Sequence, residues 1–118
     1  MKKQFLKIEN EWMSLIGTRY IGDESFQFNH VMLFLMSLID SLSNNPQNGC
    51  FASNETLANT LKIDVSSVSK YLQKLKKLGF IKTHDERDSV SKKTTRRFIY
   101  LQRDRIDEYI KLINDDEI

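Results

Sequence analysis

The sequence predicts a mainly α-helical fold with one small β-hairpin, organised as a single domain over residues 1–118. Two observations predict this class. Apolar residues recur at spacings of three and four between residues 64 and 78, as on the buried face of a helix. Two short segments typical of strands, Phe80–Thr83 and Phe98–Leu101, then flank the long polar stretch 84–97. The length fits one domain with one core.

The residues before position 43 predict an additional N-terminal segment and a long helix. Phe5–Ile8 can form a short strand or an extended arm, and a brief helical stretch follows from about Asn10 to near Gly17. We expect Gly22–Ser25 to be a turn with helix-capping residues, and the long helix after it to end near Leu42.

That long helix is apolar around nearly its whole circumference. Nine of the twelve residues in Val31–Leu42 are apolar. Such a helix is either central to its own domain or shared with a partner. The first alternative requires cover from the N-terminal segment that contains Trp12 and Ile16. The second predicts a homodimer whose interface is this helix or the C-terminal helix.

Two consecutive helices are expected after the loop at residues 44–49. Ser53 fits the N-cap of a short helix, and Asp64 fits the N-cap of the next one, which extends to Leu78. Gly79 stands where a C′ glycine ends a helix. The inward side chains of the second helix are Val68, Leu72, Leu75 and Leu78.

A last helix is expected to begin at Gln102 or Asp104. Ile106, Tyr109 and Ile110 would share one of its faces, together with Ile113.

The charge is concentrated in one block of the chain. Residues 62–97 hold eleven basic and four acidic residues, a net charge of +7, whereas the remainder holds seven basic and twelve acidic residues, a net charge of −5. Since these two regions differ so much, the block suggests a surface for a polyanion. A solvated lysine-rich surface is the alternative.

The stretch from Ser53 to Ile81 resembles bacterial winged helix-turn-helix domains of transcription regulators and of plasmid and phage replication initiators. The matching residues are Leu57-Ala58, Val68-Ser69-Lys70, Leu75 and Gly79-Phe80-Ile81. The usual turn glycine is replaced by Lys62, and the usual serine cap by Asp64. The resemblance implies a winged helix-turn-helix with a recognition helix at about 64–78 and a wing at about 80–101, which binds double-stranded DNA.

Helix geometry selects the residues that would contact DNA. With the apolar stripe inside, seven side chains of the recognition helix point outward: Ser66, Ser67, Ser69, Lys70, Gln73, Lys74 and Lys77. Base edges are usually reached from the first turns of such a helix. Lys70 is therefore expected to bind guanine, and Lys74 and Lys77 to bind phosphates.

Two further groups complete the expected DNA-binding residues. Ser53 and Asn54 lie at a helix N-terminus, where backbone N–H groups can bind a phosphate. The wing contains Lys92, Lys93, Thr94, Arg96 and Arg97. Such a hairpin can bind phosphates or insert an arginine into a narrow minor groove. A flexible charged loop is the alternative.

Few features of the sequence indicate an enzyme. His84 and the acids that follow it lack a second histidine or cysteine at metal-ligand spacing, and there is no glycine-rich phosphate loop. We expect no catalytic residue, metal, cofactor or small-molecule substrate. Cys50 is the single cysteine, no apolar signal segment follows Met1, and no run is long enough to span a bilayer. These features indicate a cytoplasmic protein without a membrane partner.

Four functions remain open, of which an enzyme has the least support. The first is sequence-specific DNA binding as a transcriptional regulator. The second is replication initiation or partition for a plasmid or phage, with the same DNA-binding module. The third is a winged helix used only for protein–protein contact. The residues leave open the target DNA sequence, any effector ligand, and whether the chain is a fragment of a longer protein.

Overall fold

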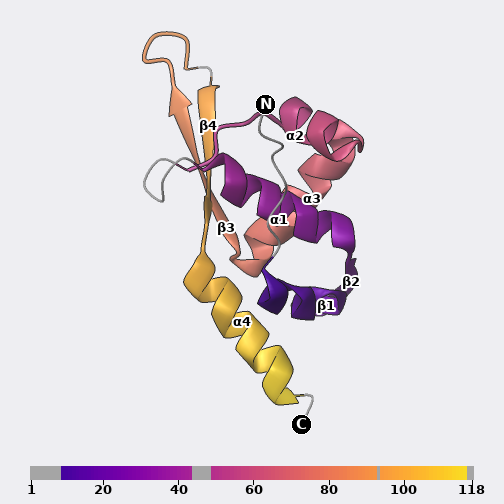
Figure 1. Cartoon of the computed structure of the whole chain (residues 1–118). Coiled ribbons are helices and arrows are strands. Elements are labelled where there is room, and N and C mark those ends of the chain that lie inside the picture. Colours follow the sequence, from indigo (N-terminus) through magenta and orange to yellow (C-terminus); the bar gives the residue numbers. More distant parts are fainter. Residues whose placement is uncertain (1–8, 44–48, 93, 117–118) are drawn as a thin grey trace.

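The computed structural model describes residues 9–43, 49–92 and 94–116. In chain order these form the 3₁₀ helix η1 (Asn10–Leu15), β1 (Gly17–Ile21), β2 (Glu24–Phe28), α1 (His30–Leu42), α2 (Asn54–Leu61), α3 (Val65–Leu78), β3 (Ile81–Arg87), β4 (Thr94–Leu101) and α4 (Arg103–Asp116). Figure 1 shows α1, α2 and α3 on one side of the β3–β4 hairpin and α4 continuing from the foot of β4. The predicted class is confirmed: a mainly α-helical winged helix-turn-helix with a β-hairpin wing, an N-terminal segment and a C-terminal helix. The expected arm at Phe5–Ile8 lies outside the described residues.

The N-terminal segment contains an antiparallel hairpin that we did not predict. β1 pairs with β2 in a register that opposes Ile21 to Glu24, so only Gly22 and Asp23 form the turn. Gly22 has φ +62°, the positive value that a type II′ turn requires at its first central position. The prediction that Gly22–Ser25 is a turn leading directly into a helix was therefore wrong.

α1 begins later than expected and is central to the domain. Asn29 caps it, since its side chain accepts a hydrogen bond of 2.9 Å from the Met32 N–H. Seven of its side chains are buried: Met32, Leu33, Leu35, Met36, Ser37, Leu38 and Ile39. Trp12 and Leu15 of η1 are also buried in this core, and Ile16 packs against it. The N-terminal segment thus supplies the cover that the apolar helix needs.

The wing has longer strands and a shorter loop than the sequence predicted. β3 and β4 pair from Ile81↔Leu101 out to Arg87↔Thr94, with an irregularity beside Glu86. Cys50 adds an isolated bridge to β4, with hydrogen bonds of 2.8 and 2.7 Å to Ile99. The polar residues 84–87 therefore belong to a strand. Their side chains are exposed to solvent, and strand pairing uses only backbone groups, so polar side chains do not prevent it.

α4 packs its apolar face on the end of the domain. Ile106 and Ile110 are buried, and the Tyr109 ring meets Phe80 edge-on at 5.3 Å between centroids. Arg103 binds Glu9 at 2.6 Å and Asp40 at 2.8 Å. The hydrogen bond to Glu9, more than that to Asp40, raises the pKa of Arg103. None of the helices in the described ranges is long and apolar enough to cross a membrane.

Candidate nucleic-acid interface

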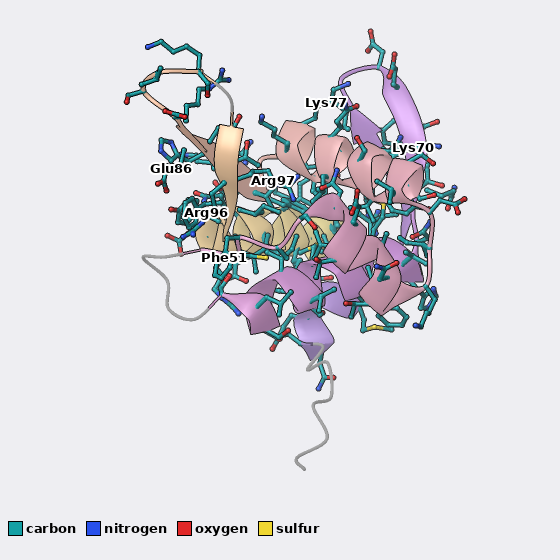
Figure 2. The ribbon with its side chains drawn as sticks, turned by 90° about the horizontal axis from the view of Figure 1, so that it is seen from above. Phe51, Lys70, Lys77, Glu86, Arg96 and Arg97 are labelled. Carbon is teal, nitrogen blue, oxygen red and sulfur yellow. The ribbon has the colours of Figure 1, made fainter. Side chains whose placement is uncertain are left out.

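α3 separates an apolar face from a polar one, as predicted. Val68, Leu72, Leu75 and Leu78 are buried. On the other side Ser66, Lys70, Gln73 and Lys77 are exposed, while Ser67, Ser69 and Lys74 are half-buried. Figure 2 shows Lys70 and Lys77 on the outward face of this helix. The exposed side chains can donate hydrogen bonds to a ligand, and two of them are cationic.

The turn before α3 takes the conformation that its usual glycine would take. Lys62 ends α2 in the left-handed region, at φ 59° and ψ 43°. Asp64 occupies the N-cap position of α3, but its side chain makes no capping hydrogen bond. Its backbone carbonyl instead accepts from the Ser67 and Val68 N–H groups, at 3.0 and 3.2 Å. The expectation that the Asp64 side chain caps the helix as a serine would is wrong.

Ser53 caps α2 as predicted, and its neighbour Asn54 has a partner within the protein. The Ser53 hydroxyl accepts a hydrogen bond of 3.1 Å from the Thr56 N–H. The Asn54 side-chain oxygen Oδ1 accepts one of 2.6 Å from the Arg97 guanidinium. Arg97 also donates to the Ala52 carbonyl at 2.9 Å. Arg97 and Asn54, both predicted DNA ligands, thus join β4 to the start of α2.

The remaining predicted wing residues differ in what they contact. The Arg96 guanidinium lies over the rings of Phe51 and Phe98, at 5.4 and 6.0 Å. Figure 2 shows Arg96 beside Phe51, on a part of the molecule away from Lys70. Lys92 is exposed, with φ 62°. Lys93 lies outside the described residues, and of Thr94 the structure gives only the backbone pairing with Arg87.

The wing also carries acidic groups. Asp88 accepts hydrogen bonds from the Val90 N–H at 2.9 Å and from the Ser91 hydroxyl at 3.2 Å. These bonds, that from Val90 first, lower the pKa of its carboxyl group. Asp85 forms a long ion pair of 3.9 Å with Arg87. The tip of the wing therefore mixes both charges, and its cations are less dominant than the count for 62–97 suggests.

The structure places the β1–β2 hairpin, which the sequence did not predict, against the predicted recognition surface. The Lys74 ammonium lies 4.6 Å from the centroid of the Phe26 ring. A groove of about 220 Å³ separates the hairpin from α3; it is lined by Ile21, Glu24, Ser25, Phe26, Lys70, Gln73, Lys74 and Lys77. The alternation of polar and apolar residues in Ser25-Phe26-Gln27-Phe28 and the Gly22-Asp23 turn could have predicted the hairpin.

Comparisons with known proteins agree with this architecture. Residues 31–81, which span α1 to the start of β3, match the model of a family described as a helix-turn-helix domain. No curated protein sequence matches the chain.

Two solved structures are similar to the chain. One is a possible transcriptional regulator from Methanosarcina mazei Go1, 14% identical, with 84% of this chain and 86% of that chain covered and a TM-score of 0.57. The other is MepR of S. aureus in a complex with DNA, 19% identical, with 75% and 66% covered and a TM-score of 0.45. Residues 31–81 are therefore similar to a helix-turn-helix domain, and the fold of the chain is similar to that of the first structure.

Proposed function

We propose that the chain binds double-stranded DNA sequence-specifically as a transcriptional regulator, with α3 in the major groove and the wing on the backbone or minor groove. One observation carries the proposal. α3 is held by a buried apolar stripe, and the opposite face presents Ser66, Lys70 and Gln73 to solvent. An α-helix fits the major groove, and these side chains donate and accept as base edges require.

Position along α3 divides the roles of its side chains. Ser66, Ser67 and Lys70 lie in the first turns, from which base edges are usually read. Lys77 lies near the C-terminal end and is assigned to a phosphate. The Lys74 ammonium lies over the Phe26 ring in the free protein. When DNA binds, Lys74 either leaves the ring to contact a phosphate or contacts the phosphate while it stays over the ring.

In this proposal the wing contacts the phosphate backbone of the DNA. Lys92, Lys93 and Arg96 are assigned to phosphates, whereas Arg97 acts mainly by fixing β4 to α2, since two of its nitrogens already donate within the protein. The Ser53 hydroxyl is likewise used by its own helix, and the first N–H groups of α2 remain the candidates for a phosphate there.

A homodimer belongs to the same proposal. Most of α1 is buried within the chain, so the apolar run 31–42 no longer requires a partner. α4 is the better candidate for the interface, because Leu112 on it is 61% exposed. A two-fold dimer would present two copies of α3 about one DNA turn (~34 Å) apart and favour a palindromic site.

We further propose a non-enzymatic protein that acts in the cytoplasm. The M. mazei protein of similar fold is described as a possible transcriptional regulator, which favours regulation over replication initiation or partition as the role of the module.

Footprinting tests the proposed function. Duplexes are first selected from a random library with the wild-type protein, and the enriched sequence is then located in the source genome and footprinted. A protected site that overlaps promoters supports regulation, and a site in a replication origin supports the replication alternative. Failure to enrich any sequence would contradict sequence-specific binding and favour a winged helix that contacts only proteins.

A further inference from the structure

The β1–β2 hairpin directs one of its faces at α3. Cross-strand partners share a face of a hairpin, so Ile21 and Glu24 lie on the same side, together with Phe26 two residues further along β2. All three line the groove against α3. Tyr20, on the opposite face, is 60% exposed. Figure 2 shows α3 between this hairpin and the wing.

The hairpin is fixed in this position at its base. The Arg19 guanidinium donates to the carbonyls of Ser14, Leu15 and Ile16, at 2.6, 2.8 and 3.2 Å. At the other strand, Phe28 is buried and its ring centroid lies 6.4 Å from that of Phe80. The hairpin is thus held at its base by hydrogen bonds and by the Phe28–Phe80 contact, and it meets α3 where the Lys74 ammonium lies over the Phe26 ring.

The end of the hairpin brings negative charge to the cationic face of α3. The groove lining contains three lysines and one acid, Glu24. Within the part of the chain that the structure describes, Glu24 forms no ion pair with these lysines. The side chain is exposed, so its carboxylate is available to whatever enters the groove.

We propose that the β1–β2 hairpin is a second DNA-contacting element opposite the wing, and that Glu24 is a specificity-determining residue. This inference rests on the proposed function. A DNA duplex that receives α3 in its major groove also comes close to the hairpin, because Glu24 lies across the protein groove from the lysines of α3. At random sequence the carboxylate faces phosphates or acceptor edges, where like charges disfavour the complex. At the correct site it accepts a hydrogen bond from a cytosine N4 amino group.

Glu24 therefore weakens non-specific binding more than specific binding. The lysines of α3 would otherwise bind any duplex, because phosphate contacts carry no sequence information. A carboxylate among them reduces this general affinity, and a cytosine donor offsets the reduction only at the right position. Because a carboxylate accepts a hydrogen bond from the cytosine amino group, we expect a cytosine in the base pair nearest Glu24.

The test compares wild type with Glu24→Gln and a matched control, Glu11→Gln. Glu11 is exposed on η1 and lines a different groove, formed with α4, so its substitution removes the same charge at a distance from α3. Fluorescence anisotropy measures binding to a random-sequence duplex and to the library-selected duplex at one salt concentration. Circular dichroism confirms that all three proteins are folded.

We expect Glu24→Gln to bind the random duplex about fivefold more tightly at low salt, because one nearby like charge is removed. Its ratio of specific to non-specific affinity should fall, and the selected sequence should lose preference for cytosine at one position. Glu11→Gln should match the wild type within twofold. If the wild type binds DNA but Glu24→Gln and Glu11→Gln have equal effects, the hairpin is no contact element and the proposed function stands. If the wild type binds no duplex, both proposals fall.

Discussion

The Arg97 guanidinium donates a 2.6 Å hydrogen bond to the side-chain oxygen of Asn54, forty-three residues earlier in the chain. A second bond from the same side chain reaches the Ala52 carbonyl. The wing strand β4 is thereby tied to the first turn of α2, the helix that precedes α3. The position of the wing relative to α3 thus depends on a cation that the sequence alone would assign to DNA.

Replacing Arg97 with alanine should lower both stability and DNA affinity. The change leaves the Asn54 and Ala52 oxygens without their donor, at a cost of about 2 kcal/mol in the free energy of unfolding. Arg96→Ala is the control, since Arg96 is exposed and rests on two rings. It should weaken binding to all sequences about equally with less than ~1 kcal/mol of destabilisation. Urea unfolding of both variants checks this, and equal losses of stability would be inconsistent with the structural role of Arg97.

Lys70→Ala should reduce specific affinity by ~1–3 kcal/mol and relax the sequence preference, because a lysine on a base edge contributes discrimination of that size. Anisotropy titrations with the selected duplex and with single-base variants measure both effects. Lys111→Ala, exposed on α4, removes the same charge far from α3 and should change neither. If Lys70→Ala keeps the wild-type affinity and preference, α3 is not the reading helix.

Lys62→Gly should stabilise the domain by about 0.5–1 kcal/mol. Lys62 has φ 59°, where a side chain with a Cβ is strained and glycine is not. The greater freedom of glycine in the unfolded chain offsets part of this gain. Gly79→Ala is the opposite case, with φ +81° and a Cβ that would lie 3.1 Å from Arg105 Nε, and it should destabilise. Thermal unfolding reports both changes, and a lower Tm for Lys62→Gly would refute the argument from φ.

Light scattering at micromolar concentration should give the mass of a dimer. Leu112→Glu places a charge on the exposed part of α4 and should yield monomers, whereas Phe34→Glu, on the 36%-exposed Phe34 of α1, should leave the dimer intact. A monomeric wild type whose footprint has no repeated half-sites would exclude the dimer and leave the winged-helix fold untouched. Loss of the dimer in Phe34→Glu alone would move the interface to α1.

The sequence predicted the start of α2 and the end of α3 well, because each of these two boundaries has a local physical cause. Ser53 caps α2 through its own hydroxyl, and Gly79 supplies the left-handed residue that ends α3. The apolar residues from Val68 to Leu78 lie on a single face of the helix, so only that face can be buried. Local signals of this kind act within a few residues and can be read without knowing the fold.

What the sequence did not predict depends on distant contacts or on a turn signal that was overlooked. The pairing of Arg97 with Asn54 joins residues in separate elements, and no spacing rule connects them. In the sequence Lys74 does not differ from the other outward lysines of this helix, and only the fold brings the Phe26 ring beneath its ammonium group. The hairpin that carries Phe26 has a local signal in Gly22-Asp23, but the acidic residues there are equally typical of a helix N-terminus.

The salt dependence of duplex binding tests the central claim most directly. If α3 and the wing neutralise ~4–6 phosphates per protomer, the logarithm of the binding constant should fall with the logarithm of salt concentration at a slope of roughly −4 to −5 per protomer. A slope near zero, or no binding to duplex DNA at low salt, would contradict the claim that this winged helix binds DNA.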